Sequence, residues 1–154
     1  MSAHRPALPS LLVGISLVAL VALSGCGSSV APAHSSRWAK AIAACRPATA
    51  EAQVTVDATN SFRFRPAAVC LQLGGTVVWK NITSGLDHTS TDEPSVAASA
   101  SDASLPAKAR GWNLRLPAGS SARRKFTEVG VYRYFCIPHE TLGMLGVVIV
   151  VRAH

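Results

Sequence analysis

A chain of 154 residues has room for one folded domain and some appendages. Its 15 Lys and Arg residues against 8 Asp and Glu residues give a net charge of +7, which suits an anionic membrane or an acidic protein partner. The charges are scattered, and their one tight cluster, Arg123-Arg124-Lys125, is typical of the solvated face of an edge strand. Without interleaved aromatic residues to stack on bases, no nucleic-acid binding is expected.

The first 26 residues are typical of an export signal. The apolar run from Leu11 to Leu23 is shorter than the roughly 20 residues of a membrane-spanning helix. The segment Leu23-Ser24-Gly25-Cys26 resembles the lipobox of bacterial lipoproteins, in which the chain is cut before the cysteine and its thiol is acylated. The resemblance implies a signal peptide over 1–25, lipidation of Cys26 and an extracytoplasmic protein anchored to the outer face of a bacterial membrane. An ordinary secretory signal cut nearby is the alternative.

Residues 26–51 are rich in Gly, Ser, Ala and Pro and predict a flexible linker after the lipidated N-terminus. Trp38 to Ala44 could form one or two helical turns within it. The folded domain is expected over 52–154.

Short segments with alternating apolar residues and turn signals fill this domain. They predict an all-β sandwich of seven to eight strands. The expected strands are 53–57, 62–64, 69–73, 76–80, 112–116, 122–127, 131–135 and 145–151. The stretch from Asp92 to Arg110 is rich in Ala and Ser, contains two prolines and is expected to be a mobile insertion.

The stretch Cys136-Ile137-Pro138-His139-Glu140-Thr141-Leu142-Gly143-Met144 concentrates a thiol, an imidazole and a thioether. A nucleophilic Cys–His pair is one interpretation, but it needs a third orienting group and a histidine brought from elsewhere in the fold. A structural zinc site is a second, but zinc takes four strong N or S ligands and methionine is a poor one.

A trigonal His₂Cys copper site with a weak axial methionine fits better. Cys136, His139 and Met144 come from this one stretch, and His88 is available in a loop after the strand that contains Trp79. Gly143 and Gly146 would let the stretch bend around the metal. Apolar neighbours would keep water away from it.

The segments 130–139 and 143–148 resemble the C-terminal signature of cupredoxins of the plastocyanin and pseudoazurin type. The segments 62–66 and 74–81, followed by His88, are similar to the pattern before the first ligand in that family. The resemblance implies a Greek-key β-sandwich that binds one copper ion, which alternates between Cu(I) and Cu(II). By this resemblance the ligands are His88, Cys136, His139 and Met144.

Two neighbours of the ligands depart from the family pattern. Thr89 stands where plastocyanins have an asparagine that ties the two ligand loops together. Phe135 stands where plant plastocyanins have an exposed tyrosine used in docking, so partner identity does not carry over.

Cys45 and Cys70 remain once Cys26 is acylated and Cys136 binds metal. In an exported protein they are expected to form a disulfide, with two free buried thiols as the alternative.

The predicted function is one-electron transfer between redox partner proteins by a monomer that is not an enzyme. A copper oxidase or nitrite reductase needs additional histidine-rich copper centres, for which the chain's five histidines are too few. The alternative is a cell-surface copper carrier. The chain has two methionines, too few for a Met-rich exchange site.

Overall fold

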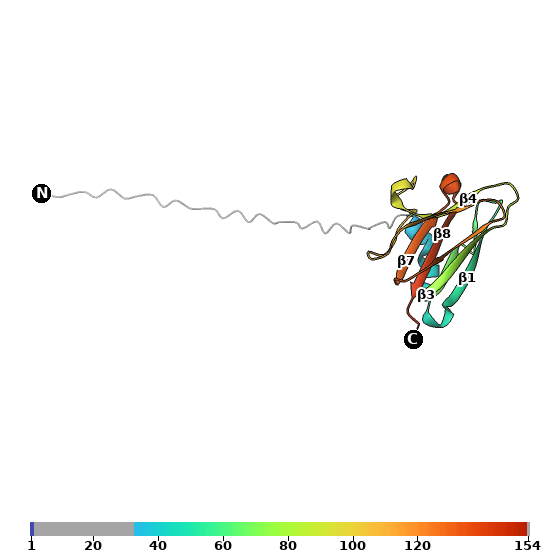
Figure 1. Ribbon diagram of the computed structural model, residues 1–154. Helices are drawn as coiled ribbons and strands as arrows, with labels where there is room; N and C mark the ends of the chain where they lie inside the picture. Colours follow the sequence, from blue (N-terminus) through green and yellow to red (C-terminus); the bar gives the residue numbers. More distant parts are fainter. Residues whose placement is uncertain (2–32, 154) are drawn as a thin grey trace. The chain divides into compact units, whose positions relative to one another are not determined.

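A computed structural model describes Met1 and residues 33–153 of the chain. In it, one α-helix, three short 3-10 helices and eight strands form a two-layered β structure with the helix packed outside (Figure 1). The prediction of an all-β sandwich with seven to eight strands is confirmed. The elements are α1 (Ala33–Ala44), η1 (Pro47–Thr49), β1 (Glu51–Ala58), β2 (Phe64–Arg65), β3 (Ala68–Asn81), β4 (His88–Asp92), η2 (Pro94–Val96), β5 (Trp112–Leu116), β6 (Ser121–Lys125), β7 (Gly130–Phe135), η3 (Ile137–Leu142) and β8 (Leu145–Val151).

Strand β3 connects the two layers. Its first half, from Ala68, pairs in parallel with β8, whereas its second half, from Thr76, pairs with β1 and β6. The change of partners falls at Gly74-Gly75, where Gly74 has a φ of 84° that a side chain would disfavour. The prediction of two strands separated by a turn at these glycines is therefore wrong, because the chain bends there without reversing.

The remaining pairings place the two ligand-bearing segments side by side. The strand order is β2-β1-β3-β8-β7-β4-β5, with β6 added to β3. Strand β7 pairs with β8 on one side and with β4 at Thr91 and Phe135 on the other. Consequently the start of β4, the end of β7 and the start of β8 meet at one end of the sandwich.

Aromatic side chains fill the space between the layers. Trp79 is fully buried, and its ring contacts the rings of Trp112, Phe126 and Tyr134. Tyr134 also packs over Gly146, where an added Cβ would overlap its ring. Gly146 is thus required for this close packing rather than for a bend in the ligand loop.

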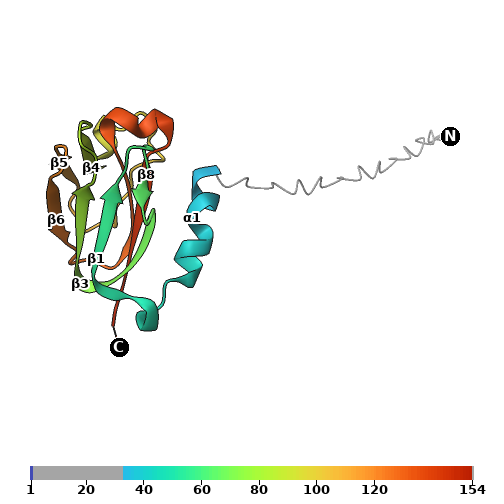
Figure 2. The same cartoon turned by 90° about the vertical axis from the view of Figure 1, so that its right-hand side faces the viewer.

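Helix α1 covers the outer face of β8 (Figure 2). Trp38 from the helix and Ile149 from β8 belong to one buried cluster, together with Phe135 at the end of β7. Strand β8 is apolar along its whole length because both of its faces are covered. Residues 33–49, expected to be mostly flexible linker, are thus partly helical and packed.

The predicted disulfide is present. Cys45, directly after α1, is bonded to Cys70 in β3 and fastens the end of the helix to the sheet. Cys136 is the free cysteine among the described residues.

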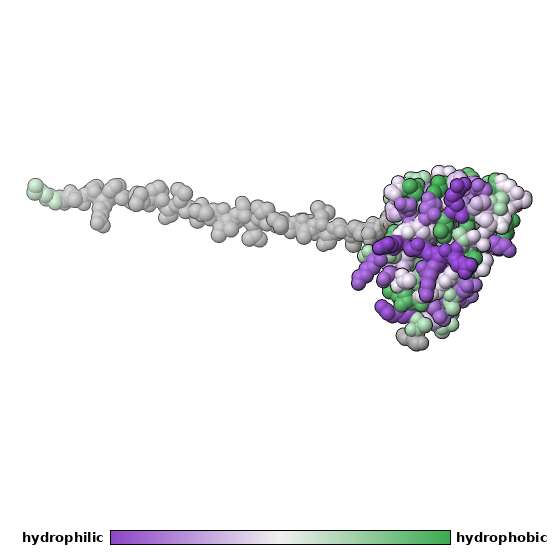
Figure 3. Space-filling model, in the orientation of Figure 1, coloured by the Kyte–Doolittle hydropathy of each residue, from purple (hydrophilic) through white to green (hydrophobic). Residues whose placement is uncertain are grey.

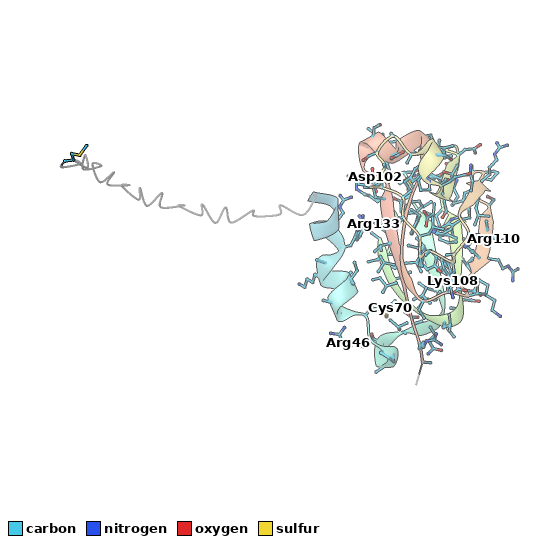
Figure 4. All side chains as sticks on the ribbon, turned by 90° about the vertical axis from the view of Figure 1, so that its left-hand side faces the viewer. Arg46, Cys70, Asp102, Lys108, Arg110 and Arg133 are labelled. Carbon is cyan, nitrogen blue, oxygen red and sulfur yellow. A yellow bond between two sulfur atoms is a disulfide. The ribbon has the colours of Figure 1, made fainter. Side chains whose placement is uncertain are left out.

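The segment between β4 and β5 follows the edge of β7. Ser104 and Arg133 exchange two backbone hydrogen bonds of 3.2 and 2.8 Å. Figure 4 labels three residues of this segment, Asp102, Lys108 and Arg110, which are spread from one side of the molecule to the other. These contacts do not agree with the expected mobile insertion, since the segment is hydrogen-bonded to the sheet.

Candidate metal centre

The predicted ligands converge from three elements at one end of the sandwich. His88 is the first residue of β4, not part of a loop as expected, and Cys136 follows β7. His139 lies in η3, and Met144 directly precedes β8. His88, Cys136 and Met144 are at most 1% exposed.

The ligand loop is shaped by its own sequence. Cys136 is extended, with φ −99° and ψ 116°, and Pro138 supports the first turn of η3. Gly143 ends this short helix in the left-handed conformation, with a φ of 80°. The amide of Cys136 then donates to the carbonyl of Met144 at 3.1 Å, and the amide of Met144 donates to the carbonyl of His139 at 3.2 Å. The loop is therefore closed by backbone hydrogen bonds.

Three donor atoms form a compact triangle. The Nδ1 atoms of His88 and His139 are 3.1 Å apart, and the Sγ of Cys136 lies 3.6 Å from the first and 3.4 Å from the second. A point equidistant from these corners lies about 2.0 Å from each, which is the length of a metal–imidazole bond and slightly less than a metal–thiolate bond. The residues present therefore fit a single metal ion.

Burial suits these residues to bind metal through neutral imidazoles. Burial lowers the pKa of His139, and burial together with the nearby His139 lowers the pKa of His88, although Asp87 opposes this shift. Burial raises the pKa of the Cys136 thiol, while the amide of Thr89, which donates to Sγ at 3.3 Å, favours the thiolate. A bound cation would favour the thiolate strongly, because metal binding displaces the thiol proton.

Thr89 ties the two ligand segments together. Its Oγ1 accepts a hydrogen bond of 2.8 Å from the amide of Ile137, the residue after Cys136. Its own amide donates to the Cys136 sulfur. A threonine thus links the two segments at the position where the family pattern has asparagine.

Asn81 organises the approach to His88. Its side-chain amide donates to the carbonyls of Leu86 and Leu116, and its Oδ1 accepts from the amide and hydroxyl of Thr83. Because Asn81 is fully buried and its side chain is fully hydrogen-bonded, the 81–88 connection has one favoured course.

Two residues that the sequence analysis did not select contact the ligand loop. The Phe62 ring stacks on the His139 imidazole, with centroids 4.4 Å apart and an interplanar angle of 26°. The Arg63 guanidinium donates to the carbonyl of Leu142 at 2.8 Å. Neither contact has a local sequence signal, because both join residues about 80 positions apart.

A trigonal set of two imidazoles and one thiolate, with a buried methionine next to it, is typical of type 1 copper proteins. Residues 50–151 match the pattern of the plastocyanin/azurin family of copper-binding proteins. The chain therefore belongs to this family. Donor set and family together identify copper as the metal of this centre.

Curated relatives agree with this assignment. The chain is 39% identical over 88 residues to the chloroplastic plastocyanin of Tetradesmus obliquus, covering 56% of this chain and 57% of the relative. It is 38% identical to the plastocyanin of Scenedesmus fuscus, covering 56% of this chain and 85% of that one. It is 33% identical over 97 residues to the halocyanin of Natronomonas pharaonis, covering 63% of this chain and 53% of the relative. The chain thus spans little more than half the length of two of these three relatives.

A pseudoazurin structure from Sinorhizobium shares the fold. It superposes with a TM-score of 0.51 at 22% identity, over 65% of this chain and 74% of that one. This likeness is one of fold and covers the sandwich.

The predicted lipidation site, Cys26, lies outside the described residues. Within the described part of the chain, no helix is both long and apolar enough to cross a membrane.

Proposed function

We propose that this protein is a one-electron carrier with a mononuclear type 1 copper site. His88, Cys136 and His139 would be the strong ligands of the copper ion, and Met144 would be a weak one. The observation that carries the proposal is the triangle of donor atoms from His88, Cys136 and His139, whose centre lies a bond length from each. When bound, copper would supply the one-electron redox couple.

The protein's contribution is a rigid ligand set. Thr89, which accepts a hydrogen bond from the loop, and Arg63, which donates one to it, hold the ligand loop from two different segments. Fixed ligands change little between oxidation states, so little reorganisation opposes electron transfer.

The half-buried His139 offers the route for electrons. Ile137 and Leu142, at the two ends of η3, are 40% and 53% exposed. Figure 3 shows apolar side chains at the end of the molecule where η3 lies. Apolar side chains around an exposed ligand edge suit brief docking of a redox partner.

The proposed setting is outside the cytoplasm. A signal peptide over 1–25 and a lipid on Cys26 would leave the folded part anchored to the outer face of a bacterial membrane, as a monomer that exchanges electrons with partner proteins. Detergent partitioning of the wild type and of Cys26→Ala tests the anchor, and equal partitioning would contradict it.

Four protein ligands favour electron transfer over catalysis, because they leave no position for a substrate. A cell-surface copper carrier remains the competing function. Rapid transfer of copper to a chelator would favour the carrier, whereas slow loss would favour electron transfer.

Copper titration tests the proposal. We expect one Cu(II) per chain, an intense blue colour and a reversible one-electron couple. Cys136→Ser should keep the fold but lose the blue colour, because the colour requires the thiolate. A colourless wild-type protein without a reversible couple would overturn the proposal.

A further inference from the structure

The segment between β4 and β5 is anchored to the ligand loop by one buried carboxylate. Glu140 directly follows the ligand His139 and is 6% exposed. Its Oε2 accepts from the amide of Ala98 at 2.8 Å, and its Oε1 accepts from the amide of Ser99 at 3.0 Å. Both carboxylate oxygens therefore hold the same stretch of backbone.

The same stretch is fixed to β7 on its other side. The amide of Asp102 donates to the carbonyl of Ser99 at 2.9 Å, and Ser104 pairs with Arg133 through two backbone hydrogen bonds. Strand β7 leads directly to Cys136. A continuous series of contacts thus runs from Cys136 through β7 and segment 98–104 to Glu140, which follows His139 in the chain.

Glu140 also takes part in the turn of the ligand loop. Its carbonyl accepts the amide of Gly143 at 2.8 Å, next to Met144. A shift of Glu140 would therefore move both ends of the His139-to-Met144 segment. Thr89 and Arg63 hold this loop at Ile137 and at Leu142, so neither holds its centre.

We propose that Glu140 is a positioning residue of the metal centre: through Ala98 and Ser99 it makes the 98–104 segment a structural support for His139. The inference rests on the proposed copper-binding function. The segment is then part of the frame that limits ligand movement.

The carboxylate suits this role because both of its oxygens accept hydrogen bonds. Hydrogen bonds to a carboxylate are roughly twice as strong as those between neutral groups. Glutamine has the same shape but offers one oxygen, and its NH₂ group would face the second amide donor. Glu140→Gln therefore removes one hydrogen bond and leaves a backbone N–H of the 98–104 segment facing an NH₂ group.

The experiment compares Glu140→Gln with Glu93→Gln in the full-length protein. Glu93 is an exposed carboxylate in the same segment, so its substitution removes the same charge without the two hydrogen bonds. Ala98→Pro changes the other partner of the interaction, because proline has no N–H and cannot donate to Glu140 Oε2. Ala97, which precedes it, has φ −74° and ψ 137°, a conformation compatible with a following proline.

The readouts are hydrogen exchange of the 97–104 amides, the rate of copper loss to a chelator and the midpoint potential. Relative to Glu93→Gln, we expect Glu140→Gln to release copper about tenfold faster and to shift the potential, in line with the loss of one charged hydrogen bond. Protection of the 97–104 amides should fall in Glu140→Gln and in Ala98→Pro. Once Ala98→Pro is present, Glu140→Gln should have a smaller additional effect.

Unchanged protection together with a copper-loss rate within twofold of Glu93→Gln would overturn the inference. Failure of the wild type to bind copper would instead overturn the proposed function. The hydrogen-exchange comparison on the metal-free protein would then still report whether Glu140 holds the segment.

Discussion

The Thr89 hydroxyl oxygen accepts the Ile137 amide at 2.8 Å and thereby joins the strand that carries His88 to the loop that follows Cys136. The Thr91 hydroxyl lies 3.0 Å from Thr89 Oγ1 and 3.0 Å from Asn113 Oδ1. Each hydroxyl has one proton, and an amide oxygen only accepts. Thr91 is the donor in both contacts and shares its one proton between Thr89 Oγ1 and Asn113 Oδ1, so the tie continues to the surface of β5.

Thr89→Val should loosen this tie while keeping a similar shape. The Ile137 amide loses its acceptor, and because this hydrogen bond is exposed the loss costs about 0.5–1.5 kcal/mol of unfolding free energy. Urea unfolding of the copper-loaded protein measures the loss, and copper release to a chelator should accelerate in parallel. Thr89→Ser keeps the hydroxyl and should restore most of both properties. Equal behaviour of the two variants would contradict the role of the hydroxyl.

Phe62→Leu should destabilise the copper-bound state. Phe62 adopts a φ of 55°, which is unfavourable for a residue with a side chain, and in this conformation its ring stacks on His139. Loss of an aromatic stack removes about 0.5–1.5 kcal/mol, which corresponds to copper release that is roughly two- to tenfold faster. Stopped-flow transfer to a chelator measures this rate. Phe62→Tyr retains the ring and should match the wild type, and a similar rate for Leu and Tyr would argue against stacking.

Asp92 should make the protein less stable as pH rises through the acidic range towards neutrality. It is fully buried, and burial raises its pKa from 3.8 to about 7, although Arg124 and the Ser104 backbone oppose this shift. Between these two pKa values the folded chain holds a proton that the unfolded chain has lost. Unfolding free energy therefore falls as pH rises from about 4 to 7, by at most about 4 kcal/mol.

Asp92→Asn removes this titration with little change in shape. The unfolding free energy of the variant, relative to that of the wild type, should increase as pH rises from 5 to 8. Urea unfolding at several pH values measures it. Parallel pH profiles for the two proteins would show that Asp92 titrates near its ordinary value in the folded state.

Replacement of both Cys45 and Cys70 by alanine should lower stability without changing the metal site. The bridge closes a loop with a sequence separation of 25, for which loop entropy predicts about 3.5 kcal/mol. Both residues lie away from the ligands, with Cys45 beside Ile149 of β8. Urea unfolding should show the loss, while the visible spectrum of the copper protein stays unchanged. A changed spectrum would mean that α1 supports the copper site.

Several features could be predicted because the residues that indicate them lie close together in the sequence. Alternating residues mark β1, β5 and β7, and the spacing of Cys136, His139 and Met144 within one loop marks the metal centre. Gly143 belongs to the same group, because its place after η3 calls for a positive φ. In each case the relevant contacts join residues a few positions apart.

Other features depend on which segments the fold brings together. The sequence predicts two strands in place of β3, because Gly74-Gly75 is as compatible with a turn as with a bend. Only the different pairing partners of the two halves show that the chain bends there. Helix α1 carries a weak local signal and is held by the packing of Trp38 on a strand more than 100 residues away.

The sequence by itself determined the metal, the ligands in the loop and the class of fold, since these follow from residue types at short spacing. Only the tertiary structure decided how that loop is held. Four residues connect the ligand loop to segments at least 41 positions away in the chain: Thr89, Phe62, Arg63 and Glu140. Such contacts leave no periodic or local pattern, because the distance that matters is measured across the folded sandwich and not along the chain.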